Sequence, residues 1–267
     1  MTNPKMTVLV VGATGSIGHF VVEEALREGH AVRALVRTAD KARKLPREAQ
    51  VVLGDVTRPD TLAGAVDGID AIVFTLGSDG AGKMGAETVD YGGVRNVLRA
   101  LSPRTARIAL MTSIGVTNRT GDYNRATESH DWKRRAERLV RASRLPYTIV
   151  RPGWFDYNRA DEHKLVFLQG DKRQAGNSSD GVIARRQIAE VLVSSLTSDE
   201  ALRKTFELVA TKGPAQEDFD DLFAALDPDS NSSLDGVRDI ANQPLEDEPQ
   251  RVRDDLDAVL ANRSASR

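Results

Sequence analysis

The sequence predicts an α/β fold in which a doubly wound parallel sheet lies between two layers of helices. Two observations predict this class. Short apolar runs of nearly uninterrupted Val, Ile and Leu are typical of strands covered on both faces. Stretches with a helical pattern separate these runs, and such alternation implies parallel strands joined by right-handed crossovers. The six runs span 7–12, 31–37, 50–55, 70–77, 107–113 and 147–153.

The remaining elements complete the sheet. A helix is expected over 16–28, because its apolar residues share one stripe. A later helix at about 185–197 and a strand at 205–211 extend the sheet. We therefore predict a single domain over 1–267. Its core comprises about 6–153 plus 183–211, and a small substrate-side cap comprises about 154–182 and 212–267.

After Gly213 the composition shifts toward acidic residues. Two amphipathic helices are expected here, with apolar residues at helical spacing. A solvated acidic face is the favoured interpretation of the charge, and an acidic interaction tail is the alternative. The apolar positions are Phe219, Leu222, Phe223 and Leu226 in the first helix and Val252, Leu256, Val259 and Leu260 in the second.

Composition excludes several classes of function. The chain has 267 residues, a formal net charge of −2 and no cysteine, so nothing global indicates nucleic acid or an anionic membrane as a partner. Disulfides and thiolate metal sites are excluded, and the four histidines lack metal-ligand spacing. The amino-terminal residues lack a signal-peptide layout, and no apolar run approaches the ~20 residues that span a bilayer. We expect a cytoplasmic monomer or homodimer that acts on a small molecule and holds no metal.

The stretch "VLVVGATGSIG" carries the strongest functional signal. Its three glycines fall between a buried strand and a helix, the context in which a glycine fingerprint indicates dinucleotide binding. Gly12 permits the tight turn, Gly15 lets a pyrophosphate approach the backbone, and Gly18 lets the helix pack closely on the sheet. A glycine turn without a ligand is the alternative. The other loop residues expected to contact the cofactor are Thr14, Ser16 and Ile17.

The end of the second strand indicates which dinucleotide binds. An acidic residue there binds the ribose 2′-hydroxyl, whereas a cation accommodates a 2′-phosphate. Here Arg37 holds that place, with Lys41 and Arg43 close behind and no carboxylate before Asp40. The sequence therefore predicts NADP (NADPH) as the cofactor. The alternative is that Arg37 is an ordinary surface arginine.

Several stretches resemble one protein family. "GATGSIG", "GDVTRPDTLAGAVDGIDAIV", "VDYGGVRNVLRA", "TSIG" and "LPYTIVRPGWF" look like atypical, extended-type short-chain dehydrogenase/reductases of the NmrA-like and NAD(P)H-binding branch. The resemblance covers about residues 6–211 and implies a Rossmann-type fold. It also implies three groups of cofactor contacts. They are Asp55 and Val56 beside the adenine, Thr75, Leu76 and Gly77 along the dinucleotide channel, and Pro152, Gly153 and Trp154 beside the nicotinamide.

The same resemblance identifies a broken catalytic pair. Active members use Tyr-x-x-x-Lys on the helix after the fifth strand, with Ser or Thr at the end of that strand. The lysine holds the nicotinamide ribose and lowers the tyrosine pKa, so that the phenol can exchange a proton. Ser113 matches the strand-end position and Lys133 matches the lysine, and these two are the catalytic candidates. Ser129 stands where the tyrosine is expected.

Periodicity gives a second view of the helix that carries Lys133. Its buried stripe is expected to comprise Trp132, Ala136, Leu139, Val140 and Ser143, whereas Arg134, Arg138 and Arg141 are expected to point away from it. Lys133 and Arg135 lie at the margins, so the pattern alone lets either reach inward. With the resemblance added, Lys133 is interpreted as a ribose contact, and a solvated lysine is the alternative.

These observations leave three hypotheses for function. The favoured one is an NADP(H)-dependent oxidoreductase without the tyrosine acid, which reduces quinone-, flavin- or enone-like acceptors. The second is a non-catalytic, NADP(H)-sensing regulatory protein, as the NmrA-like resemblance suggests. The third, a nucleotide-sugar epimerase, is disfavoured because the missing tyrosine normally starts the oxidation. Tyr123 and Tyr157 are the tyrosines that could approach the site from elsewhere.

Overall fold

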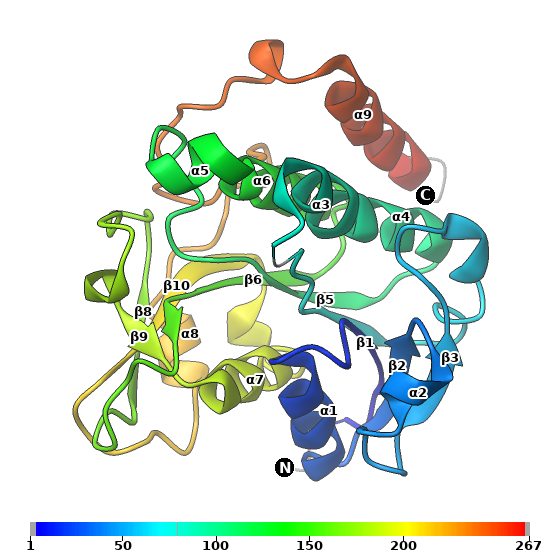
Figure 1. The fold of residues 1–267 in the computed structure, drawn as a ribbon, viewed down its shortest axis with the longest axis horizontal. Helices are drawn as coiled ribbons and strands as arrows, with labels where there is room; N and C mark the ends of the chain where they lie inside the picture. Colours follow the sequence, from blue (N-terminus) through cyan, green and yellow to red (C-terminus); the bar gives the residue numbers. More distant parts are fainter. Residues whose placement is uncertain (1–3, 79, 265–267) are drawn as a thin grey trace.

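A computed structural model describes residues 4–78 and 80–264 and shows a mostly parallel sheet between layers of helices (Figure 1). Within this described part, ten strands form one sheet in the order β3-β2-β1-β4-β5-β6-β10-β9-β7, and β8 pairs with β10. The strands are β1 (Thr7–Val11), β2 (Ala31–Val36), β3 (Gln50–Leu53), β4 (Ala71–Phe74), β5 (Arg107–Met111), β6 (Tyr147–Pro152), β7 (Trp154–Phe155), β8 (Lys164–Leu168), β9 (Val182–Ile183) and β10 (Lys204–Thr211).

The predicted fold class is confirmed. Strands β1 to β6 pair in parallel, and β10 joins β6 in parallel, whereas β8 and β9 run antiparallel to β10. The four strands β1, β4, β5 and β6 are buried almost throughout, because helices cover both faces of the sheet. The sequence pattern missed the short strands β7, β8 and β9, which lie inside the segment expected to form a cap.

The helices form two layers, and Figure 1 shows α1, α7 and α8 on one side of the sheet and α3 to α6 on the other. Helix α9 lies outside α6 and α4, so this side has an extra layer. The α-helices are α1 (Gly18–Arg27), α2 (Ala39–Ala42), α3 (Gly82–Gly85), α4 (Gly92–Leu101), α5 (Asp122–Thr127), α6 (Ser129–Ala142), α7 (Arg185–Ser194), α8 (Asp220–Ala224) and α9 (Gln250–Ser264). Shorter turns are the π-helix η2 (Ala86–Tyr91) and the 3₁₀ helices η1 (Pro59–Thr61), η3 (Ser178–Asp180), η4 (Asp199–Ala201) and η5 (Leu245–Asp247).

The carboxyl-terminal segment packs on the helices as well as on the sheet. In α8, Phe223 is fully buried against Phe167 and Phe206. In α9, Val252 and Leu256 are buried in the apolar cluster that includes α4 and α6. The sequence predicts that 212–267 lies on the substrate side. In the structure, Asn242 of this segment does reach the loop after β5, but α9 packs on the outer helical layer.

The arginines of α6 correct an expectation. The predicted buried stripe of this helix is confirmed, since Trp132, Ala136, Leu139, Val140 and Ser143 are all buried. However, Arg134, Arg138 and Arg141 do not point into solvent. They are 0%, 2% and 5% exposed. Periodicity could not foresee this, because the segment that covers them is about a hundred residues further along the chain.

Acidic residues of the carboxyl-terminal segment cover these arginines. Arg138 donates to both carboxylate oxygens of Asp235 at 2.9 Å and to Glu248 at 2.9 Å. Arg141 pairs with Asp229 at 3.2 Å. The acidic composition after Gly213 is therefore neither a solvated face nor an interaction tail at these positions. We call residues 229–248 the acidic strap, because they lie along α6 and supply carboxylates to its arginines.

One fully buried arginine lies at the centre of this network. Arg151 in β6 pairs with Glu137 of α6 at 2.7 Å and with Asp239 of the strap at 2.7 Å, and it approaches Glu207 of β10 at 3.5 Å. Burial alone would raise the pKa of Glu137, but Arg151, Arg141 and a hydrogen bond from Thr112 lower it to about 2. The guanidinium thus joins two strands, one helix and the strap by charge-assisted hydrogen bonds.

A second buried carboxylate connects this network to the loop after β5. Asp171 accepts hydrogen bonds from the backbone nitrogens of Gly115 and Thr117 at 2.6 and 2.7 Å, and its own backbone nitrogen donates to Glu207 at 3.1 Å. Burial raises the pKa of Glu207 to about 8, since the single contact with Arg151 offsets only part of the desolvation.

We predict that Arg151→Met lowers the free energy of unfolding by about 3–5 kcal/mol, because it leaves buried carboxylates without their cation. The control is Arg58→Met. Arg58 and its partner Asp60 are each 67% exposed, so this change is expected to cost less than about 1 kcal/mol. Urea unfolding measured on both variants checks the prediction, and equal costs would contradict it.

We also predict that Glu207 makes the protein less stable as the pH rises. The folded protein keeps the Glu207 proton up to about pH 8, whereas the unfolded chain releases it near 4.5, so stability falls between these values. Glu207→Gln cannot ionise and keeps an acceptor oxygen for Asp171. The variant is therefore expected to lose less stability than the parent between about pH 6 and about pH 9 in urea unfolding. Parallel losses in the parent, in Glu207→Gln and in the exposed control Glu217→Gln would contradict the assignment.

Candidate functional site: the carboxyl edge of the parallel sheet

The parallel strands bring most of the predicted site residues to one edge of the sheet. The chain order reverses between β1 and β4, which are adjacent in the order β3-β2-β1-β4-β5-β6. In open α/β sheets, ligands bind outside the carboxyl ends of the strands at such a switch point. Loops after β1 to β6 carry the predicted contacts, and Lys133 comes to this edge from the first turn-and-a-half of α6.

The geometry of the glycine loop fits a dinucleotide. Gly12 has φ +96°, and a Cβ atom there would lie 2.8 Å from the carbonyl oxygen of Thr75. A Cβ atom on Gly18 would collide with the carbonyl of Gly12, so this position also requires glycine. Gly15 is exposed together with Thr14 and Ser16, whereas Ile17 is buried. Gly12 and Gly18 therefore pack closely on the protein, whereas the loop is exposed at Gly15, where a pyrophosphate would approach.

The amino terminus of α1 supports the same interpretation. No side chain caps this helix, and its first turn holds no acidic residue. Its first backbone N–H groups and the positive end of its dipole lie next to the exposed Gly15 loop. A phosphate group supplies the acceptors that an uncapped helix start needs. The residues present thus fit the diphosphate of a nicotinamide dinucleotide.

Basic side chains follow β2. Arg37 is the first residue after this strand and is exposed, as are Lys41 and Arg43 in and after α2. Asp40 is the nearest carboxylate in sequence, and its side chain pairs with Arg43 at 3.2 Å. The end of β2 therefore offers an uncommitted guanidinium and no acid for a ribose 2′-hydroxyl.

The loop after β3 carries two of the predicted adenine contacts. Asp55 is half-buried, and its Oδ1 accepts from the backbone nitrogen and the hydroxyl of Thr57, both at 2.9 Å. Val56 is buried, and its carbonyl accepts from Asn96 at 2.8 Å. Both residues are thereby fixed at the carboxyl edge. Their contact with an adenine stays a prediction.

The loop after β4 lies directly beside the glycine loop. The backbone nitrogen of Thr75 donates to the carbonyl of Val11 at 2.9 Å, and its hydroxyl also faces that carbonyl at 3.3 Å. Thr75 therefore holds β4 against the start of the glycine loop. Leu76 is half-buried and Gly77 is exposed, so these two residues are the more accessible part of the predicted channel.

The predicted catalytic residue Lys133 lies in an ordered polar cluster with Asp90 and Ser78. Lys133 Nζ lies 2.6 Å from Asp90 Oδ1, and the two side chains are 16% and 3% exposed. Ser78 donates to the other oxygen of Asp90 at 2.5 Å. Lys133 is therefore not a solvated lysine. Among the residues that the structure describes, none supplies a hydrogen-bond partner to the buried Oγ atom of Ser113, which leaves this hydroxyl available to a bound molecule.

Asp90 and Ser78 were missed by sequence reasoning. Asp90 stands within "VDYGGVRNVLRA", a stretch that the family resemblance includes, and a carboxylate in an otherwise apolar helical pattern is a usable signal. Its direction could not be predicted, because it lies in the π-helix η2 that precedes α4. Such π-helical turns interrupt the ordinary helical spacing and often occur at functional sites.

No phenol is seen to complete the pair. Ser129 starts α6 and is buried. Tyr91 donates to Asp255 and Tyr147 donates to Asp229, both at 2.9 Å, and burial raises the pKa of each phenol. The other two tyrosines are Tyr123 and Tyr157, which are 59% and 66% exposed.

The residues expected beside the nicotinamide lie at the end of β6. The Pro152 carbonyl accepts from Ile114 at 3.0 Å, which joins the ends of β5 and β6. A Cβ atom on Gly153 would lie 2.5 Å from the carbonyl oxygen of Gly181, so glycine permits this close approach. Trp154 then donates its backbone nitrogen to Gly181 and leaves its side chain 38% exposed.

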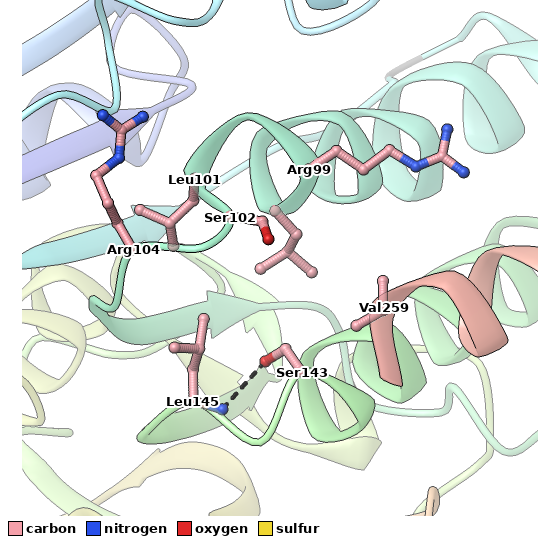
Figure 2. Close-up of a pocket in the computed structure, with 8 residues that line it drawn as sticks. Arg99, Leu101, Ser102, Arg104, Ser143, Leu145 and Val259 are labelled. Atoms are coloured by element: carbon pink, nitrogen blue, oxygen red, sulfur yellow. Dashed lines mark hydrogen bonds between the residues drawn. The ribbon is translucent and has the colours of Figure 1, made fainter. Parts of the chain in front are cut away.

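Two cavities lie elsewhere. One of about 20 Å³ lies between the carboxyl ends of α4 and α6 and helix α9, and Leu98, Leu145 and Val259 help to line it (Figure 2). Helices α4 and α6 end at this cavity, just before β5 and β6 begin, so the cavity lies at the amino edge of the sheet. The volume suits about one water molecule. The second, about 520 Å³, lies between α6 and the acidic strap.

Residues 4–78 and 80–264 show neither a metal-binding cluster nor a membrane-spanning helix. No group of three or more His, Asp or Glu side chains there could hold a metal ion. None of the helices in those ranges is long and apolar enough to cross a membrane.

Known proteins share this architecture. The family model described as NAD(P)H-binding matches residues 12–199. An uncharacterised chloroplast protein of Arabidopsis thaliana is 31% identical over 251 residues, which cover 84% of this chain and 77% of the relative. Sanguinarine reductase of Eschscholzia californica is 27% identical, and the match covers 84% of this chain and 97% of that protein.

Solved structures agree. A candidate NAD-dependent epimerase/dehydratase from Bacillus halodurans superposes with a TM-score of 0.67 at 25% identity, over 78% of this chain and 96% of the other. An anaerobillin reductase from Escherichia coli O157:H7 shares the fold, with a TM-score of 0.61 at 24% identity over 78% of this chain and all of the other. The family match spans more than half of the chain and includes the glycine loop, the switch point and Lys133. The protein therefore belongs to the NAD(P)H-binding family of atypical short-chain dehydrogenase/reductases.

Proposed function

We propose that this protein is an NADP(H)-dependent oxidoreductase that works without the tyrosine acid of its family. The observation that carries the proposal is the ion pair between Lys133 and the buried Asp90. In tyrosine-containing members the lysine charge lowers the pKa of a phenol. Here a carboxylate neutralises that charge, so Lys133 is suited to holding a ribose by hydrogen bonds rather than to supporting proton transfer.

The bound dinucleotide would supply a hydride at the nicotinamide ring, and the chain would supply binding and orientation. One of the three N–H donors of Lys133 faces Asp90, which leaves two for the ribose hydroxyls. Ser113 is held at the end of β5 with its hydroxyl free, so it can donate a hydrogen bond to an acceptor oxygen. The accompanying proton would come from water.

This arrangement favours acceptors that need little help from an enzymic acid. A serine hydroxyl at position 129 is too weak an acid to replace a phenol, and its side chain is shorter. Quinone-, flavin- and enone-like molecules are reduced more readily than a secondary alcohol is oxidised under these conditions. A relative named sanguinarine reductase is consistent with a reductase role.

The alternative is a non-catalytic, NADP(H)-sensing protein. A Synechocystis relative named photosystem II assembly factor Ycf39 favours it, with 27% identity over 78% of this chain and 63% of that protein. The third candidate is a nucleotide-sugar epimerase, and a Bacillus subtilis relative named as an uncharacterised sugar epimerase favours it. Ser129 argues against this candidate, because it stands where the tyrosine that starts the oxidation is expected. We propose a cytoplasmic location, because a sequence without cysteine fits a reducing compartment.

The test is NADPH oxidation across a panel of quinones, flavins, enones and secondary alcohols. The proposal expects turnover with at least one quinone, flavin or enone and none with the alcohols. Tight NADPH binding without turnover on the whole panel would favour the sensing protein. Rapid and specific oxidation of a secondary alcohol would sink the proposal.

We predict that NADPH binds more tightly than NADH, because the free guanidinium of Arg37 can pair with a 2′-phosphate. Arg37→Asp is expected to weaken NADPH binding by about tenfold or more while sparing NADH, since a charged hydrogen bond contributes about 1.5–3 kcal/mol. Titration calorimetry with both nucleotides measures this. Equal affinities of the unaltered protein for NADPH and NADH would rule out the assignment.

We predict that Lys133→Ala and Asp90→Asn each raise the dissociation constant of NADPH by about tenfold, with a smaller effect on turnover at saturation, because Asp90 positions the ammonium group. Lys212→Ala is the control, since Lys212 is 84% exposed. A catalytic phenol supplied by another segment of the chain would give a different result from these variants. In that case Tyr123→Phe or Tyr157→Phe would abolish turnover and leave NADPH binding intact.

A further inference from the structure

Exposed aromatic side chains gather at the carboxyl edge of the sheet. Among the described residues, three large exposed apolar side chains are aromatic: Tyr123, Trp154 and Tyr157. All three lie in segments that follow the ends of β5 or β6, and Trp154 directly follows Gly153. Single exposed apolar side chains are ordinary, but aromatic rings grouped at a binding edge indicate a recognition surface.

Trp154 and Tyr157 form a corner with a defined shape. Their ring centroids lie 6.2 Å apart, and the ring planes meet at 84°. A flat molecule that stacks on one of these rings therefore meets the other ring edge-on, an arrangement that aromatic groups prefer.

The backbone that carries this corner is held in place. Trp154 and Asp156 donate their backbone nitrogens to the carbonyls of Gly181 and Ile183 at 2.9 and 2.8 Å. Asp156 has φ +57°, an uncommon conformation for a residue other than glycine. Its carboxylate accepts from the backbone nitrogen of Arg185 at 3.2 Å and also pairs with that guanidinium. The exposed rings are thus presented by a fixed turn.

A second apolar group follows the neighbouring strands. Met84 in α3 is 76% exposed, and Tyr123 in α5 is 59% exposed. The two short helices are in contact, and Lys83 and Glu128 form an ion pair of 2.9 Å between α3 and the residue after α5. Loops after β4, β5 and β6 therefore all expose large apolar side chains at the same edge of the sheet.

We propose that Trp154 and Tyr157 bind the electron acceptor, and that this acceptor is a planar, fused-ring aromatic molecule such as a naphthoquinone or an isoalloxazine. The inference rests on the proposed function and narrows its acceptor class, since a small, puckered enone cannot stack on the corner. Trp154 directly follows Gly153, so a ring stacked there lies next to the expected nicotinamide position. The backbone of the same segment meets the loop of Ser113, because the Pro152 carbonyl accepts from the backbone nitrogen of Ile114.

The experiment uses menadione, flavin mononucleotide and 2-cyclohexen-1-one as probes of the full-length protein. Trp154→Leu and Tyr157→Leu are compared with Ile240→Ala, which removes an exposed apolar side chain in the acidic strap. Trp154→Leu is expected to raise the KM for menadione about tenfold and to change kcat less, because it removes a stacking partner and not a reacting group. In Tyr157→Leu, which lies outside the expected cofactor contacts, the KM for 2-cyclohexen-1-one and the dissociation constant of NADPH are expected to stay unchanged.

A binding measurement separates this inference from the proposed function. The chain has two tryptophans, and Trp132 is buried, so quenching of the exposed Trp154 reports an aromatic ring at the corner. Menadione and flavin mononucleotide are expected to quench the NADP⁺-saturated protein, and Tyr157→Leu is expected to weaken this binding. If quenching follows this pattern but no acceptor is turned over, Trp154 and Tyr157 bind aromatic molecules as proposed, and the proposed reductase function is wrong.

The opposite pattern overturns the inference. Turnover of menadione with an unchanged KM in Trp154→Leu and Tyr157→Leu would leave the oxidoreductase intact and remove the corner as its acceptor site. A concentration-dependent dimer in analytical ultracentrifugation, lost in Trp154→Leu, would show that a second copy of the chain covers the rings and would equally refute the proposal.

Discussion

The buried guanidinium of Arg151 lies where four parts of the chain meet, and their arrangement depends on its charge. It contacts Glu137 of α6, Asp239 of the acidic strap and Glu207 of β10 from its own place in β6. Removing the cation, Glu137 or Asp239 would leave an uncompensated buried charge, which costs more than the intact network stabilises. Such a network selects one arrangement of strand, helix and strap, because apolar contacts alone tolerate small shifts.

The same network reaches the candidate site. Glu137, which Arg151 holds, also accepts a hydrogen bond from Thr112 at 2.8 Å, one residue before Ser113. Asp171 holds the loop at Gly115 and Thr117 and is itself joined to Glu207. The residues on both sides of Ser113 are thus fixed by buried carboxylates, which positions its unpartnered hydroxyl without using it.

In the proposed function, the residues for cofactor binding and those for acceptor binding are separate. The glycine loop and the Lys133–Asp90 pair are built from backbone and buried charge, which suits a ligand whose phosphates and ribose must be held in one position. The exposed rings of Trp154 and Tyr157 offer contact area without a fixed hydrogen-bond pattern. Under this proposal, acceptors can vary more than the cofactor, because ring stacking imposes no fixed hydrogen-bond pattern.

The sequence by itself determined the sheet and the glycine loop, because these follow from local patterns: continuous apolar strands and glycines at a turn. The expected cofactor contacts also rest on local signals, such as the cation after β2, and they stay predictions. Only the tertiary structure decided the environment of the charged residues. Arg134, Arg138 and Arg141 lie on the face of α6 that periodicity assigns to solvent, yet the strap buries them. Likewise, Asp90 meets Lys133 across 43 residues through a π-helical turn. Charge pairing between distant segments has no local period, so a single sequence cannot reveal it.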